Sequence, residues 1–140
     1  MSKKNIIPTI FLMVFISCGG FQAWNNTSSY DKAKFIGNST NIIYDNLMQQ
    51  LTANIKVLVD KYENQGTLTP VEYKELRELR SVVKDKLGGY FYVNKAYLIA
   101  MKKWDETGKE PSNMNVILSS LKDYADLFAQ ISDRYNLFNQ

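Results

Sequence analysis

The 140-residue sequence contains no histidine and only one cysteine. Without histidine, the chain has no imidazole general base and no Ser-His or Cys-His nucleophile pair. It also lacks the side chain that most often binds metal ions in proteins. A single cysteine excludes an intrachain disulfide and any metal site built from several cysteines. We therefore expect that the protein is not an enzyme, and that it uses no metal or cofactor and has no small-molecule substrate.

Two structural patterns are also absent. No run of residues alternates between apolar and polar between hairpin signals, so we expect no β-sheet. No glycine-rich loop joins a strand to a helix, where it would cradle a phosphate group. The length and the 45% apolar fraction fit one folded domain, which we expect to be all-α.

The first 18 residues, MSKKNIIPTIFLMVFISC, have the order of a secretory signal. Lys3 and Lys4 precede an apolar stretch from Ile6 to Ile16, and the small residue Ser17 stands directly before Cys18. The apolar stretch is too short to span a bilayer. This pattern predicts an exported protein.

The run Phe15-Ile16-Ser17-Cys18 resembles the lipobox of bacterial lipoprotein signals, although Phe15 stands where that family usually has Leu, Val or Ile. The resemblance implies cleavage before Cys18 and acylation of Cys18 with fatty acids such as palmitate. It places the protein in the bacterial cell envelope, anchored to a membrane and facing the periplasm or the outside. Gly19 lacks the aspartate that often retains such proteins in the inner membrane, which favours the outer membrane in a bacterium with two membranes.

Two alternatives to lipidation remain. No charged residue lies between Lys4 and Asp31, so residues 6–24 reach roughly the length of an uncleaved membrane anchor. The other alternative is that Cys18 is an inert, buried cysteine. Removal of residues 1–17 would take Lys3 and Lys4 away, leaving 15 of the 17 basic residues against 14 acidic ones. So small a net charge gives no reason to expect a nucleic-acid partner.

The chain divides into a signal peptide at residues 1–17, a lipidated cysteine with its tether at residues 18–29, and a helical domain at residues 30–140. In the tether, Phe21 and Trp24 either lie at the level of the lipid headgroups or pack on the domain. In the domain, the first helical stripe ends near Gly66 and consists of Tyr44, Met48, Leu51, Ile55, Leu58 and Tyr62. Residues 30–36 either extend this helix or are separated from it by a fresh start capped by Thr40.

A second helix is expected from Pro70 to Glu106. Thr69, Pro70 and Glu72 provide a capping box with proline at the first helical position. The apolar stripe keeps its phase across Gly88 and Gly89, whose cost in a helix we expect a kink or a close neighbouring helix to offset. Its members are Tyr73, Leu76, Leu79, Val83, Leu87, Tyr90, Asn94, Tyr97, Met101 and Trp104.

A third helix is expected from Ser112 to Asn136, with an uninterrupted stripe of Met114, Ile117, Leu121, Tyr124, Phe128, Ile131 and Tyr135. Short connections between three long helices predict an antiparallel up-down-up three-helix bundle.

Two groups of side chains stand out as candidate sites. Glu72, Glu75 and Glu78 alternate with Lys and Arg, which indicates a solvated helix face more than a catalytic or cation site. Tyr92, Ala96 and Ile99 form a second apolar strip away from the core stripe, with Phe91 at the edge of that stripe. Such a strip is typical of a partner surface or of self-association, unless residues 21–35 fold back over it.

The sequence therefore predicts a small, lipid-anchored helical envelope protein that acts by protein binding or as a structural module. Its partners would be a membrane, through the lipid on Cys18, and a protein or a second copy. Similar small helical lipoproteins are also encoded by phages and prophages, where they block receptors or interfere with further infection, and this is one alternative. A single-pass, signal-anchored helical protein is another.

Overall fold

The computed structural model describes residues 24–135, and these residues are built from helices without any strand. The helices are α3 (Ser29–Gln65), α4 (Pro70–Ser81), the π-helical segment η2 (Val82–Lys86), α5 (Tyr90–Thr107) and α6 (Met114–Tyr135). The all-α prediction is thus confirmed for this part of the chain. The predictions for the signal segment, Cys18, Phe21 and Asn136 lie outside the described residues.

Helix α3 is continuous through residues 30–40, where the sequence allowed either one helix or a fresh start. Ser28 caps it by accepting a hydrogen bond from the Asp31 backbone N–H at 3.1 Å. Thr40 is not a cap: it is fully buried within the helix, and its hydroxyl donates to the Ile36 carbonyl at 2.7 Å. Gly37 leaves room for a residue of α5, because a Cβ atom at that position would lie 2.0 Å from Cζ of Tyr97.

The prediction of one helix from Pro70 to Glu106 is wrong. Helix α4 ends at Ser81, and in η2 the Leu87 N–H reaches back five residues to the Val82 carbonyl, at 3.1 Å. A turn at residues 87–89 then leads into α5. At the π turn Val82 is buried where the sequence predicted Val83. Beyond the turn the stripe is confirmed, since the following members are buried: Leu87, Tyr90, Tyr97 and Met101. The range 29–135 therefore contains four α-helices where the sequence predicted three.

Gly89 lies close to a neighbouring helix, which is one of the two ways in which we expected the cost of the glycines to be offset. A Cβ atom there would lie 2.3 Å from the hydroxyl of Tyr124 on α6. The glycine thus lets α6 come close to the start of α5, which offsets part of the cost of interrupting the helix.

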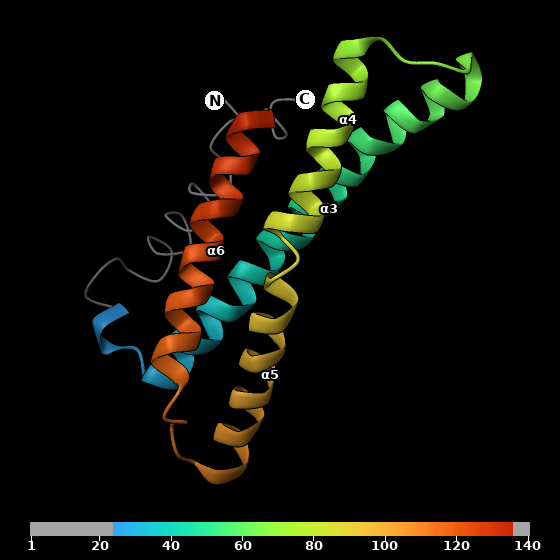
Figure 1. Ribbon diagram of the computed structural model, residues 1–140. Coiled ribbons are helices and arrows are strands. Elements are labelled where there is room, and N and C mark those ends of the chain that lie inside the picture. Colours follow the sequence, from blue (N-terminus) through green and yellow to red (C-terminus); the bar gives the residue numbers. More distant parts are fainter. Residues whose placement is uncertain (1–23, 136–140) are drawn as a thin grey trace.

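Helix α6 packs against both α3 and α5, and α4 packs on α3 (Figure 1). An aromatic cluster lies at this junction, centred on the fully buried Tyr90. Its ring stacks on Tyr44 with centroids 4.4 Å apart, and it meets Phe128 at 5.3 Å and Tyr124 at 5.6 Å edge-on. The predicted stripe of α6 is confirmed as core, with Met114, Leu121 and Phe128 fully buried.

The C-terminal half of α3 and helix α4 form a hairpin that extends away from α6 (Figure 1). Gly66 ends α3 in the left-handed conformation (φ 77°), as its sequence predicted. The predicted capping box is also confirmed: the Glu72 N–H donates to the Thr69 hydroxyl at 3.2 Å, and the Thr69 N–H donates to Oε1 of Glu72 at 2.9 Å. We refer below to residues 56–81 as the α3–α4 hairpin.

The start of α3 lies beside the end of α5. Tyr30 meets Trp104 edge-on with ring centroids 5.3 Å apart, and its hydroxyl donates a hydrogen bond to the Asp105 carboxylate. Just upstream, Trp24 packs edge-on against Phe35 at 5.5 Å. Of the two interpretations of Trp24, the structure therefore shows packing on the domain. The structure also places Tyr30, at the start of α3, against the C-terminal end of α5.

Candidate functional site

The strip predicted from the sequence lies on one side of α5. Tyr92 and Ile99 are 72% and 60% exposed, while Ala96 between them is half-buried. The alternative to an open strip was coverage by residues 21–35, and the described part of that segment, residues 24–35, does not bury it. Phe35, the last of them, packs against Trp24. The structure thus brings the three residues together on one accessible surface.

Two large apolar residues beside the strip were not assigned to it from the sequence. Phe91 is 64% exposed, so its placement at the edge of the core stripe is wrong, and Leu98 is 57% exposed. Helix α5 contacts α3 and α6 only through the side that carries Tyr90, Tyr97 and Ala100. Because Phe91 and Leu98 are seven residues apart, they share a helix side that faces away from both neighbours.

The exposed side of α5 is basic as well as apolar. We call it the outer face of α5, and it consists of Phe91, Tyr92, Lys95, Leu98, Ile99, Lys102 and Lys103. None of the three lysines forms an ion pair with any residue in the range 24–135. The helix carries no acidic residue from Tyr90 to Trp104. Of the two that follow in α5, Asp105 accepts the hydrogen bond from Tyr30, and the exposed Glu106 lies one turn beyond Lys102 and Lys103.

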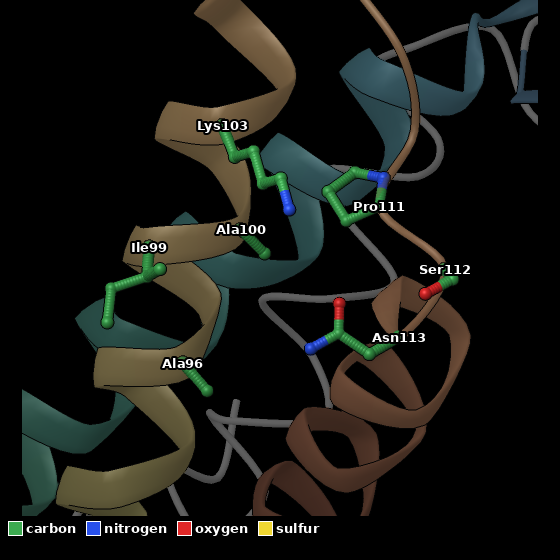
Figure 2. A pocket seen from close by; sticks show the side chains of 7 residues that line it. All are labelled: Ala96, Ile99, Ala100, Lys103, Pro111, Ser112 and Asn113. Carbon is green, nitrogen blue, oxygen red and sulfur yellow. The ribbon is translucent and has the colours of Figure 1, made fainter. Parts of the chain in front are cut away.

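A shallow pocket of about 470 Å³ lies next to this face, between α5 and the start of α6. On the α5 side the pocket is lined by the small side chains of Ala96 and Ala100, which leave space there. Figure 2 shows both pointing toward Asn113. Lys103 reaches across the pocket toward Pro111, whereas Ile99 lies on the outer side of α5 (Figure 2). The pocket is therefore apolar where Ala96 and Ala100 line it and positively charged at its edge, where Lys103 lies.

The three carboxylates that the sequence offered for acid-base chemistry do not form a site together. Glu72 serves the capping box and pairs with Lys61 of α3, whereas Glu78 pairs with Arg134 of α6 at 3.6 Å. The Lys61 ammonium and the Thr69 N–H lower the pKa of Glu72. Among residues 24–135 no group of three or more His, Cys, Asp or Glu side chains is placed to hold a metal ion.

The buried tyrosines are held in their neutral form. Burial raises the pKa of Tyr90 and of Tyr97, since the phenolate is poorly solvated between packed helices. The Tyr90 hydroxyl donates to Oδ1 of Asn41 at 3.3 Å, and the Tyr97 hydroxyl donates to the Lys34 carbonyl at 3.4 Å. Both hydroxyl groups thus form hydrogen bonds from α5 to α3.

In the described part of the chain, no helix combines the length and the hydropathy that a membrane crossing requires. Comparison of the sequence and the structure with protein-family models, with curated proteins and with solved structures gives no match.

Proposed function

We propose that the chain is a lipid-anchored helical protein of the bacterial cell envelope that acts by binding through the outer face of α5, and not by catalysis. The proposal includes export by residues 1–17, acylation of Cys18 and an up-down-up order of three antiparallel passes. In that order α4, η2 and α5 together make the second pass. The single observation that supports binding is the exposure of four large apolar side chains on one side of α5.

The size of these side chains makes the observation informative. Single exposed apolar residues are common on soluble proteins, but contiguous apolar surface usually marks a site of contact. Phe91 and Tyr92 lie at 5.5 Å between ring centroids, and Leu98 and Ile99 follow two helical turns later. The apolar side chains therefore lie along residues 91–99 of α5, toward its N-terminal end, and an occupant would remove them from water.

Side-chain footprinting in native envelopes tests this proposal without naming the occupant. The hydroxyl-radical oxidation of Phe91 and Tyr92 is compared between intact envelopes and the detergent-extracted protein. Tyr62, which is exposed on the α3–α4 hairpin, and Val116, which is exposed on α6, serve as internal controls. We expect at least threefold protection of Phe91 and Tyr92 in envelopes with no change at the controls, and equal oxidation in both states would contradict the proposal.

Replacement of Cys18 tests the anchor separately. Cys18→Ser removes the only thiol in the chain, so the variant should lose all metabolic fatty-acid labelling and accumulate with residues 1–17 attached. Mass spectrometry of the wild-type protein should find an acylated N-terminus at position 18. A variant that is labelled as strongly as the wild type would refute the lipoprotein interpretation.

A further inference from the structure

We propose that the outer face of α5 lies on the membrane itself, with Lys95, Lys102 and Lys103 at anionic headgroups and Phe91, Tyr92, Leu98 and Ile99 at the boundary between headgroups and acyl chains. This inference rests on the proposed binding role of that face and names its occupant as an anionic lipid surface.

The residue types on the face favour lipid over protein. The cores of protein–protein interfaces are poor in lysine and rich in arginine and aromatic residues. The outer face of α5 has three lysines, no arginine and no acidic residue between Tyr90 and Trp104. Helices that rest on membranes combine aromatic and leucine side chains with lysines in this way, because the flexible lysine stem keeps the ammonium in the headgroup layer.

The charge of the face also argues against a second copy. In a symmetric dimer through this face, three lysines of one chain would oppose the same three lysines of the other. The acidic residue on that side of α5, Glu106 near its C-terminal end, is one carboxylate against three ammonium groups, so the two faces would still repel. An anionic lipid layer, in contrast, complements all three, and each lysine near such a surface strengthens association about fivefold.

The position of the chain's N-terminal side makes this contact reachable. Tyr30 fixes the start of α3 against Trp104 and Asp105, at the C-terminal end of α5. Six residue steps separate Cys18 from Trp24, so an extended chain reaches at most about 20 Å. Helix α5 is about 27 Å long at its 1.5 Å rise per residue. A membrane attachment at or before Cys18 therefore holds one end of the outer face within reach of the same bilayer.

The test uses the full chain with Cys18→Ser, so that acylation plays no part in the result. Leu98→Cys introduces the only cysteine of this variant on the outer face, and it carries a polarity-sensitive nitrobenzoxadiazole label. A matched chain carries the label through Val116→Cys, at a similarly exposed position on α6. Both are mixed with phosphatidylcholine vesicles, and with vesicles in which roughly one lipid in three is phosphatidylglycerol.

We expect the label at position 98, and not the label at position 116, to shift to shorter wavelength with anionic vesicles. Spin-labelled lipids with a shallow nitroxide should quench it. Salt near 0.5 M should reverse the shift, because the Debye length falls to a few ångströms. The triple variant Lys95→Gln, Lys102→Gln, Lys103→Gln should need roughly 100-fold more anionic lipid for the same shift.

The triple variant Lys74→Gln, Lys84→Gln, Lys122→Gln provides the matched control, because it removes the same charge from exposed positions off the face. We expect it to shift like the parent chain. Equal loss in both triple variants would show that only net charge matters, and would overturn the proposal. Equal spectra with both kinds of vesicle, or no association with anionic vesicles, would also overturn it.

Two further outcomes would assign the face to another occupant. A shift without vesicles would identify a second copy or the chain's own N-terminal segment as the cover. Protection of Tyr92 in native envelopes together with no shift on vesicles would identify a protein partner, and it would leave the proposed binding role of the face standing while this inference fails.

Discussion

The two ends of this molecule are stabilised in different ways. Where α3, α5 and α6 meet, each helix faces two neighbours, and large side chains such as Tyr90, Phe128 and Leu47 are removed from water almost completely. In the α3–α4 hairpin the two helices pack on each other, α6 reaches α4 through the Arg134–Glu78 ion pair, and Leu79 is the only buried residue of α4. The comparison shows that a two-helix layer buries only a narrow stripe, so that caps and polar contacts contribute a larger share of its stability.

The boundary between the two regions lies at η2 and the turn that follows. The π turn and the two glycines separate α4 from α5, and α5 starts at Tyr90 without a side-chain cap. The hairpin therefore reaches the bundle through an irregular backbone segment. We expect the hairpin to open at lower free energy than the three-helix part, as peripheral units of proteins generally do.

The largest expected effect comes from a charge placed in the three-helix part. Phe128→Asp puts a carboxylate among the rings of Tyr44, Tyr90 and Tyr124, at a fully buried position. Loss of the ring and burial of the charge cost roughly 4 kcal/mol or more, which is most of the stability of a small domain. We expect the cooperative circular-dichroism melt to disappear.

Val116→Asp is the matched control, because it introduces the same charge into α6 at an exposed position. Its melting temperature should stay within about 2 °C of the wild type, as for most surface substitutions. An unchanged melt for Phe128→Asp would show that the three-helix part is not the main source of stability.

A smaller effect is expected at the contact between α3 and α5. Gly37→Ala places a methyl group on the Tyr97 ring, and the strain of overpacking, about 1–3 kcal/mol, opposes a helix-propensity gain of about 1 kcal/mol. We expect net destabilisation in a urea titration, whereas Asn38→Ala, at the exposed neighbouring position, should not destabilise. Adding Tyr97→Ala should make Gly37→Ala stabilising, and additive effects of the two substitutions would contradict the contact.

The sequence predicted those features that depend on local chemistry. Thr69 and Glu72 form the capping box, Gly66 ends α3, and the stripe of α6 is buried, because caps and a clean period of 3.6 residues leave few alternatives. The break after Ser81 was missed. The apolar stripe continues across the break, so spacing alone gave no sign of it.

The outer face of α5 was predicted only in part, because some of its residues depend on tertiary packing. Tyr92, Ala96 and Ile99 were identified because they lie opposite the predicted core stripe. Phe91 and Leu98 were missed because their exposure depends on where α3 and α6 lie around α5. The core positions Tyr90, Tyr97 and Met101 kept the predicted phase across the π turn. Lysines between apolar residues on one helix side were the signal that would have identified the complete outer face of α5.

The smallest expected effect separates the hairpin from the three-helix part by pH. The pKa of Glu72 is lowered in the folded chain by its hydrogen bond from Lys61 and by the Thr69 N–H, so its carboxylate stabilises the folded state at neutral pH. This contribution is complete above the pKa of an unfolded glutamate, about 4.3, and is lost as the pH falls through the lower, folded value. The melting temperature should therefore fall in that acidic window, modestly, because the pair is exposed to solvent.

Glu72→Gln should remove the contribution at every pH, so its melting temperature should be lower at pH 7 and flatter between pH 5 and pH 3 than that of the wild type. Glu75→Gln is the matched control, since Glu75 is exposed on the same helix and forms no ion pair with any residue in the range 24–135. Nuclear magnetic resonance signals of Tyr62 and Tyr73, whose rings lie 6.5 Å apart across the hairpin, report the loss locally. If those signals and the Tyr90 cluster respond together, the hairpin and the three-helix part unfold as one unit, and the difference between them is one of packing alone.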